Sequence, residues 1–191
     1  MKPSQKSELR AAVLARRDAI PAAQRDTRSR ELSRQVAALP EFAVARTVMA
    51  YMPMGSEFDT RPLLQAVLSR GARLVLPRVE RATKTLALHA VADLDASLQA
   101  GVWGIREPDP QRCPLASLGE VDFILMPGAA FDRQRHRMGY GGGFYDKLLS
   151  RPERHAITVA VAFVEQLVAQ VPVEPHDVPV DILVSDDGLY R

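Results

Sequence analysis

Residues 121–127 read VDFILMP, a short and almost continuously apolar run that ends at a proline. A run of this length and composition is typical of a strand that is buried on both faces of a parallel sheet. Residues 157–163 (ITVAVAF) form a second such run. These two segments predict the centre of a sheet that is covered by helices.

The segments around this centre alternate between the two kinds of secondary structure. Further strands are predicted at 47–52, 73–77, 85–91 and 181–185, and helices at 4–19, 21–39, 60–70 and 145–149. The alternation predicts a single α/β domain over residues 1–191, with a mostly parallel central sheet flanked by helices and an N-terminal helical segment at 4–39. The pattern does not predict the strand order.

Composition limits the class of protein. The chain has 191 residues, of which 47% are hydrophobic and 25% charged, with a formal net charge of +2. This is ordinary globular composition, and the nearly neutral charge disfavours nucleic-acid binding. The longest apolar run, residues 156–164, is about half of the ~18–20 residues that a membrane span needs. We therefore expect no membrane and no nucleic-acid partner.

The single cysteine and the N-terminus bear on location. Cys113 has no second cysteine with which to form a disulfide, and no ligand spacing for a metal site surrounds it. The first ten residues are polar and lack the apolar stretch of a secretory signal. We expect a cytoplasmic protein, an inert Cys113 and a monomer.

The predicted sheet gives a place to the polar loops. In open α/β sheets, ligands bind at the carboxyl ends of the strands. The segments that follow the strands at 47–52, 73–77 and 121–127 therefore share one edge. Glu57 is thus expected on the same edge as the glycine-rich segment at 139–143.

Residues 137–146 (RMGYGGGFYD) carry four glycines within five positions. Exposed amides in such a loop favour phosphate oxygens, although the glycines by themselves favour a structural turn. The loop matches neither G-x-x-x-x-G-K-[ST] nor G-x-G-x-x-G, because the last position of the second pattern falls on Phe144. Arg133, Arg135 and Arg137 precede the glycines, and guanidinium groups bind phosphate, which favours the phosphate site.

Two carboxylates and three rings complete this region. Asp146 follows the loop, and Mg²⁺ bound to a nucleotide uses one or two carboxylates together with phosphate oxygens and water. Asp181, before the last predicted strand, is a candidate second carboxylate. The alternative for Asp146 is a charge at the start of a helix. Tyr140, Phe144 and Tyr145 offer flat surfaces on which a ring system stacks.

Several segments together resemble the 5-formyltetrahydrofolate cyclo-ligase family, also called 5,10-methenyltetrahydrofolate synthetase. They are KSELR (6–10), EFDT (57–60), WGIREP (103–108) and above all MPGAAFD (126–132) followed by RMGYGGGFYD (137–146). The resemblance runs from about residue 4 to Val184. It implies the α/β fold of the sugar-phosphate isomerases and CoA transferases, which agrees with the alternation of strands and helices.

The resemblance implies a role for each matching residue. The implied ATP contacts are Lys6, Ser7, Glu8, Leu9, Arg10, Arg137, Met138, Gly139, Tyr140, Gly141, Gly142, Gly143, Phe144 and Tyr145. The implied folate contacts are Met52, Glu57, Trp103, Tyr140, Gly141, Gly142, Gly143 and Phe144. The implied magnesium ligands are Asp146 and Asp181, and Lys6 and Arg137 are the implied catalytic cations. Some relatives have Arg and Lys where this chain has Tyr140 and Gly142, so more phosphate charge falls to Lys6, Arg10 and Arg137.

The implied reaction converts 5-formyltetrahydrofolate and MgATP into 5,10-methenyltetrahydrofolate, ADP and phosphate. ATP phosphorylates the formyl oxygen, and N10 of the same molecule then closes the ring. Such a reaction needs no Ser/His/Asp triad and no reactive cysteine, and the sequence offers neither. Three alternatives are a ligand-binding module without turnover, a sugar-phosphate isomerase and a nucleic-acid binder. The first is disfavoured by the retention of Glu57, Asp146 and Asp181.

Overall fold

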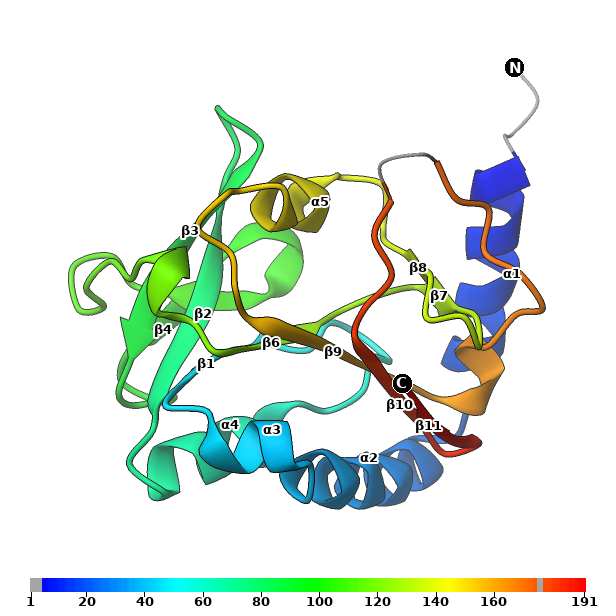
Figure 1. Ribbon diagram of the computed structural model, residues 1–191, viewed down its shortest axis with the longest axis horizontal. Coiled ribbons are helices and arrows are strands. Elements are labelled where there is room, and N and C mark those ends of the chain that lie inside the picture. The colour runs from blue at the N-terminus through cyan, green and yellow to red at the C-terminus, as the bar shows by residue number, and fades with distance from the viewer. Residues whose placement is uncertain (1–4, 175–176) are drawn as a thin grey trace.

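A computed structural model describes residues 5–174 and 177–191 of the chain. A seven-stranded sheet with the order β11-β10-β9-β6-β1-β2-β3 lies at its centre (Figure 1). Strands β10, β9, β6, β1 and β2 are parallel, and the two edge strands β3 and β11 are antiparallel to their neighbours. The predicted α/β fold with a mostly parallel sheet is confirmed. The strands are β1 (Thr47–Met49), β2 (Arg73–Glu80), β3 (Thr85–Val91), β6 (Phe123–Met126), β9 (Ile157–Ala162), β10 (Ile182–Ser185) and β11 (Gly188–Tyr190).

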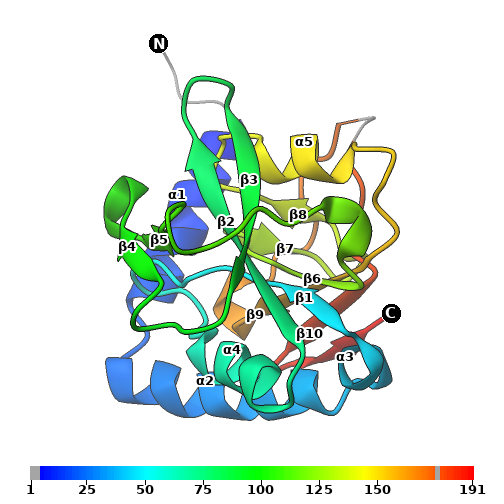
Figure 2. The ribbon, with the colours of Figure 1, turned by 90° about the vertical axis from the view of Figure 1, so that its left-hand side faces the viewer.

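Helices cover the two faces of the sheet. Figures 1 and 2 show α2, α3 and α4 along one face, α5 on the opposite face and α1 beside the short strands β7 and β8. The helices are α1 (Gln5–Asp18), α2 (Ala22–Ala37), α3 (Pro40–Val44), α4 (Arg61–Ser69) and α5 (Phe144–Leu149), with the 3-10 helices η1 (Val102–Gly104), η2 (Leu118–Glu120) and η3 (Val164–Gln166). Two small ladders pair β4 (Leu98–Ala100) with β5 (Arg106–Pro108), and β7 (Ala130–Phe131) with β8 (Arg137–Met138).

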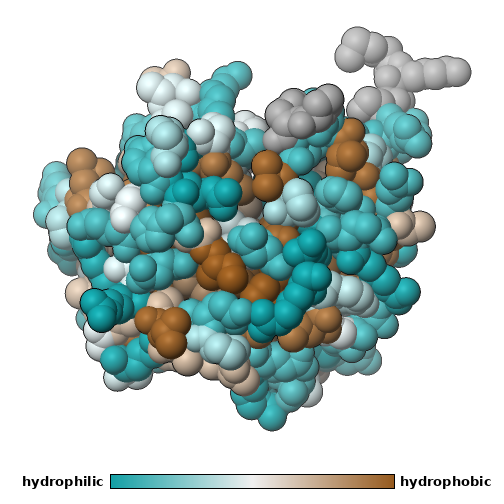
Figure 3. Space-filling view, in the orientation of Figure 1, coloured by the Kyte–Doolittle hydropathy of each residue, from teal (hydrophilic) through white to brown (hydrophobic). Residues whose placement is uncertain are grey.

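Strand β6 divides the core because alternate side chains of a strand point to opposite faces. Phe123 and Leu125 pack into the cluster under α2, α3 and α4, which includes Leu32 and Val36 of α2. Ile124 and Met126 pack into the cluster under α5, which includes Leu148. All four residues of β6 are buried, as expected for a central strand with a layer on each side. Figure 3 shows that the exterior on the side seen in Figure 1 is mostly hydrophilic, with hydrophobic residues in small groups.

Two strand ends differ from the prediction. The strand predicted at 47–52 ends at Met49, and one further bond of the ladder, from Ala50 N–H to the Val75 carbonyl oxygen at 3.0 Å, follows it. The strand predicted at 73–77 continues through Pro77 to Glu80. Pro77 lies beyond the end of β1, where β2 pairs with β3 alone, and such an edge position tolerates proline. The longer β2 makes one wall of the site.

Helix α1 attaches to the side of the sheet rather than to either main face. Val13 packs with Ala130, Met138 and Val171 in a third small cluster. This contact places the inner side of α1 against β7 and β8, directly before the glycine-rich segment. No helix in the described part of the chain is long and apolar enough to span a bilayer.

Candidate functional site

The glycine-rich segment, which we call the glycine loop (residues 139–143), connects β8 to α5 and lines a cavity of about 800 Å³. Gly141 has φ +97° and Gly143 has φ +65°, backbone conformations that favour glycine. At Gly142, a Cβ atom would lie 2.5 Å from the Phe144 ring. The loop therefore needs glycine at Gly141, Gly142 and Gly143 to turn sharply beside the cavity.

Three cations line the cavity next to this loop: Lys6 and Arg10 from α1, and Arg137 from β8. Arg10 Nε donates to the Gly139 carbonyl oxygen at 2.9 Å, so its guanidinium lies over the loop. As noted for the family resemblance, this chain has Tyr140 and Gly142 at positions where some relatives have basic residues. Arg10 puts positive charge at this place from a different segment.

Two of these three cations are paired with acids. Lys6 Nζ lies 2.8 Å from Glu174 Oε1 and 3.7 Å from Asp177 Oδ2, and the hydrogen bond with Glu174 raises the pKa of Lys6. Arg137 Nη2 donates to Asp146 Oδ1 at 2.7 Å. A phosphate that enters the cavity would therefore meet cations that already have anionic partners, and it must compete with these carboxylates.

Glu57 lies on the other side of the glycine loop, in the segment that follows β1. Its Oε2 accepts the Met54 amide at 2.8 Å, and its Oε1 accepts the Tyr140 hydroxyl. Burial raises the pKa of Glu57, and the Tyr140 and Met54 hydrogen bonds and the charge of Arg17 oppose that rise. The carboxylate thus sits at the cavity in a fixed orientation.

Arg17 is a buried member of this network that the sequence analysis did not identify. Its side chain is 5% exposed, and it donates from Nη1 to the Tyr140 hydroxyl at 2.7 Å and from Nε to Ser56 Oγ at 2.9 Å. Ser56 Oγ in turn donates to Asp18. Lys6, Arg10, Val13 and Arg17 follow an i, i+4, i+7, i+11 stripe, so helical spacing from Lys6 and Arg10 could have identified Arg17.

The remaining wall of the cavity comes from β2, β3, β5 and the residue that precedes β5. Its apolar members are Leu76, Pro77, Val79, Leu86 and Ile105. An apolar wall opposite a cationic loop fits one ligand with a flat ring system and another with phosphates. The sequence analysis did not identify these residues, because their role depends on how the β2–β3 hairpin faces the glycine loop.

The structure brings most of the predicted site residues to this one cavity. Its lining includes Lys6, Arg10, Met52, Glu57, Arg137, Met138, Gly139, Tyr140, Gly141, Gly142, Gly143, Phe144, Tyr145 and Asp146. Ser7, Glu8 and Leu9 lie on α1 but are not part of the lining, and Leu9 packs toward Val13. Trp103 lies in η1, and its side chain is outside the part of the chain that the structure describes.

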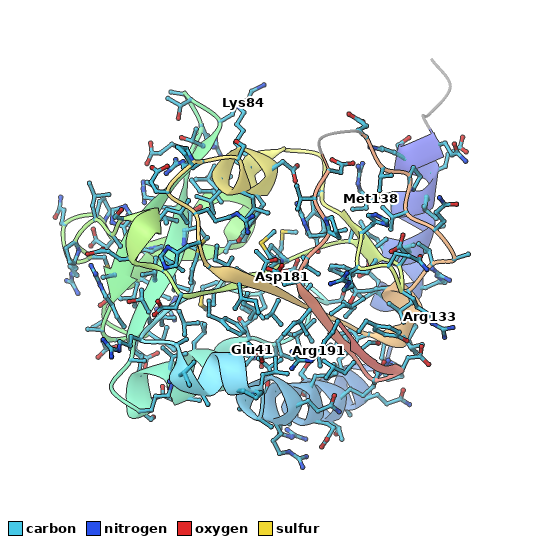
Figure 4. All side chains as sticks on the ribbon, in the orientation of Figure 1. Glu41, Lys84, Arg133, Met138, Asp181 and Arg191 are labelled. Carbon is cyan, nitrogen blue, oxygen red and sulfur yellow. The ribbon has the colours of Figure 1, made fainter. Side chains whose placement is uncertain are left out.

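Asp181 does not join Asp146 in the cavity lining. It directly precedes β10, at the amino ends of the parallel strands, whereas the cavity lies at their carboxyl ends (Figure 4). Asp181 Oδ2 accepts the amide and the hydroxyl of Thr158, each at 2.7 Å. Within residues 5–174 and 177–191, no group of three or more His, Cys, Asp or Glu side chains is arranged to hold a metal ion.

Cys113 is buried away from the cavity lining, where its Sγ donates to the Ser97 carbonyl oxygen at 3.3 Å. Burial raises the pKa of the Cys113 thiol. A thiol in this state is a poor nucleophile, which supports the interpretation of Cys113 as a packing residue.

Comparison with known proteins gives consistent matches over nearly the whole chain. The model of the 5-formyltetrahydrofolate cyclo-ligase family matches residues 2–186. The 5-formyltetrahydrofolate cyclo-ligase of Mycolicibacterium smegmatis is 39% identical over 180 residues, which cover 93% of this chain and 92% of that protein. The enzyme of the same name from Mus musculus is 29% identical over 193 residues, covering 97% of this chain and 95% of that protein.

Solved structures agree with these sequence matches. The NMR structure of Aquifex aeolicus 5,10-methenyltetrahydrofolate synthetase superposes with a TM-score of 0.86 at 36% identity, over 98% of this chain and 93% of that one. The 5,10-methenyltetrahydrofolate synthetase of Mycoplasma pneumoniae gives a TM-score of 0.76 at 18% identity, over 95% and 98% of the two chains, and this likeness shows the fold alone.

Proposed function

This chain belongs to the 5-formyltetrahydrofolate cyclo-ligase family, and we propose that the cavity between α1, the glycine loop and the β2–β3 hairpin is its active site. The protein is a ligase of one-carbon folate metabolism that forms 5,10-methenyltetrahydrofolate from 5-formyltetrahydrofolate in an ATP-dependent reaction. The observation that supports this site best is the junction of a cationic glycine loop with an apolar wall and a carboxylate in one cavity. The cationic glycine loop suits ATP, and the apolar wall with the carboxylate suits a reduced folate.

The chemistry explains why no nucleophilic side chain is needed. The N5-formyl oxygen attacks the γ-phosphorus of ATP, and the bond between the γ-phosphorus and the β,γ-bridging oxygen breaks to release ADP. N10 then attacks the formyl carbon, its proton leaves, and the C–O bond breaks to release phosphate. Both nucleophiles belong to the folate. The protein therefore has to align the two substrates and stabilise the charge on the moving phosphoryl group.

Lys6 and Arg137 are the proposed catalytic cations, with Arg10 as a further phosphate contact. Arg137 is held beneath the loop by Asp146 and by the Pro127 carbonyl oxygen, which accepts Arg137 Nη1 at 3.3 Å. Its guanidinium lies over the Tyr145 ring at 5.8 Å. These contacts would orient the guanidinium toward a triphosphate at Gly139–Gly143.

Asp146 fits a magnesium ion that ATP brings with it. Its carboxylate is half-exposed at the cavity, and one carboxylate with phosphate oxygens and water completes a typical nucleotide-bound Mg²⁺ site. The ion would neutralise phosphate charge during transfer. We propose Asp146 as the magnesium ligand. The role of Asp181 as a ligand stays a prediction, and its contacts with Thr158 support a structural role in joining β9 to β10.

Met52, Glu57 and Trp103 are the proposed folate contacts outside the glycine loop. Glu57 would accept N–H hydrogen bonds from the pterin, and the rings of Tyr140 and Phe144 would border it. We also propose that the protein acts in the cytoplasm as a monomer.

The decisive experiment for the activity mixes purified protein with 5-formyltetrahydrofolate, ATP and Mg²⁺. We expect methenyl-folate absorbance and ADP to appear together in equal amounts. Folded protein that forms no methenyl product, or forms it without ATP, would rule out this function. Release of ADP without methenyl product would instead indicate a nucleotide-binding module without turnover.

The site is tested with Asp146→Asn. Loss of one carboxylate charge should raise the Mg²⁺ concentration needed for half-maximal rate by about tenfold or more, because metal sites lose about 10- to 100-fold affinity when a supporting group is removed. Asp26→Asn on the exposed face of α2 is the matched control and should behave as wild type. An unchanged Mg²⁺ requirement in Asp146→Asn would remove this residue from the metal site.

A further inference from the structure

Glu107, on β5, is a further acidic residue of the cavity lining, and neither the family resemblance nor the reaction above assigns it a role. The side chain lines the cavity, yet the residue is only 4% exposed. It belongs to the WGIREP segment (103–108), in which Trp103 is the implied folate contact. Acidic residues are rarely buried to this degree unless they are paired.

The hydrogen bonds of Glu107 leave one oxygen without a partner. Val79 N–H donates to Oε1 at 3.2 Å, and Oε2 accepts no hydrogen bond from any described residue. Among the described residues, Ser33 Oγ is the one fully enclosed side-chain polar atom without a partner. Oε2 of Glu107 is therefore not sealed in the core, and Glu107 belongs to the lining of the cavity.

Packing holds this carboxylate in place. Gly101 lies directly behind it, and a Cβ atom at that position would come 2.4 Å from Glu107 Cγ and 2.5 Å from Oε2. Any larger residue at Gly101 would push the carboxylate away. Glycine at this position thus makes room for the carboxylate at the cavity wall.

The neighbouring arginines do not neutralise Glu107. Arg106 Nη2 donates to the Asp95 carbonyl oxygen at 3.0 Å. Arg78 Nη1 donates to the Pro108 carbonyl oxygen at 3.3 Å, and its Nε lies 3.7 Å from Glu80. A buried carboxylate with a single neutral hydrogen bond is costly, so a donor from a ligand would relieve that cost.

We infer that Glu107 binds an N–H group of the reduced pterin ring and is, with Glu57, a specificity-determining acceptor for the folate. This inference rests on the proposed function. The carboxylate lies in the same wall as Val79, Leu86 and Ile105, which would contact the flat ring. Its negative charge would repel a triphosphate, which the cations at the glycine loop attract instead. ATP also carries an N–H donor, the amino group of its adenine. The experiment distinguishes binding of adenine from binding of the pterin.

The test is Glu107→Gln, which keeps an acceptor for Val79 N–H but removes the charge and one acceptor position. We expect the Kd of 5-formyltetrahydrofolate, measured by calorimetry on the folded protein, and its KM to rise about tenfold, as for the loss of one charge-assisted hydrogen bond. The Kd of a non-hydrolysable ATP analogue should change less than about twofold. Glu80→Gln, at the exposed end of β2, is the control and should match wild type.

The outcomes separate this inference from the proposed function. Unchanged folate binding in Glu107→Gln, with an active wild type, would refute the inference alone. Weaker binding of the ATP analogue with unchanged folate binding would assign Glu107 to adenine, and this result would also refute the inference. A wild type that neither binds nor converts 5-formyltetrahydrofolate would refute the proposed function and this inference with it. A wild type that binds folate without turnover would refute the function only, and a raised Kd in Glu107→Gln would still support the inference.

Discussion

Glu57 keeps its carboxylate between the Met54 amide and the Tyr140 hydroxyl, in a position where burial raises its pKa above the ordinary value of 4.5. Between 4.5 and the raised pKa, the folded protein holds a proton on Glu57 that the unfolded chain has released. Stability from this group is therefore greatest below 4.5 and falls as the pH rises through the folded pKa.

The prediction concerns Glu57→Gln, which does not titrate. The free energy of unfolding of the variant minus that of wild type should rise as the pH increases from about 4.5 to neutrality. The altered contact with Met54 adds a cost that does not change with pH. Urea unfolding at several pH values measures this difference. Glu41→Gln is an instructive control, because the Arg191 hydrogen bond lowers the pKa of Glu41, and Figure 4 shows the two side by side. Its pH dependence should be small and of opposite sign. A difference that is flat with pH in Glu57→Gln would contradict the buried carboxylate.

Arg135 is strained in its backbone. Its φ is +71°, a left-handed conformation that costs a non-glycine residue on the order of 1 kcal/mol. Hydrogen bonds hold it there: its amide donates to the Asp132 carbonyl oxygen at 2.9 Å, and its own carbonyl oxygen accepts Val180 N–H at 3.0 Å. The loop before β8 therefore imposes this conformation. Strand β8 in turn leads into the glycine loop of the proposed active site.

Arg135→Gly should raise the free energy of unfolding by about 0.5–1 kcal/mol, since relief of the strain exceeds the loss of one exposed hydrogen bond from Nη1 to the Asp181 carbonyl oxygen. Denaturant unfolding measures the change. Lys84, at the tip of the β2–β3 hairpin in Figure 4, has φ +52° and is the matched control, for which Lys84→Gly should give a similar gain. A loss of stability in Arg135→Gly alone would show that its side chain matters more than its backbone.

At the scale of elements, α1 is both a packing helix and a wall of the cavity proposed as the active site. One stripe of this helix carries Lys6 and Arg10 at the cavity, Val13 in a small apolar cluster and Arg17 beneath Tyr140. The Arg17 guanidinium holds the hydroxyl that in turn holds Glu57. We therefore propose that Arg17 is a positioning residue, which would act on the folate through these two side chains.

Arg17→Gln should raise the KM for 5-formyltetrahydrofolate several-fold with a smaller effect on the KM for ATP, because Tyr140 and Glu57 lose their support. The free energy of unfolding should fall by about 1–3 kcal/mol, as expected when a buried charged hydrogen-bond donor is removed. Steady-state kinetics with each substrate varied in turn separates this role from general loss of structure. Arg16→Gln, on the exposed face of the same helix, is the control, and Arg17→Lys should recover part of the folate affinity. Equal rises in both KM values would indicate a purely structural role.

Local pattern predicted the elements that depend on their own residues. The run at 121–127 contains the fully buried strand β6, and the helix predicted at 21–39 packs on the core through Leu32 and Val36. The pairs β4–β5 and β7–β8 were missed because they are strands of two or three residues, too short to show periodicity. Arg17 was not predicted, because the buried side of a helix is recognised from its apolar residues and Arg17 is charged.

At the scale of the whole molecule, most of the residues predicted for the site line one cavity, although the sequence pattern does not show how they meet there. The loops after β1 and β6 do share the carboxyl edge, and Glu57 contacts Tyr140 as that placement implies. Asp181 lies elsewhere, because a residue that precedes a parallel strand lies at the opposite edge of the sheet. Glu107 was not foreseen, since its role depends on burial behind Gly101 and on an oxygen without a partner, which only the folded arrangement reveals.

The long-range contacts of α1 also have a consequence for synthesis of the chain. Arg10 bonds to Gly139, 129 residues further along, and Arg17 bonds to Tyr140, 123 residues further along. At about 5–20 residues per second, a ribosome needs roughly 6–26 s to make that intervening segment. Ser56, which bonds to Arg17 and Asp18, is made early in this interval, but the partners of α1 in β7, β8 and the glycine loop are still missing. We therefore expect α1 to dock late, so that the nascent protein gains its catalytic competence only after most of the sheet has been translated.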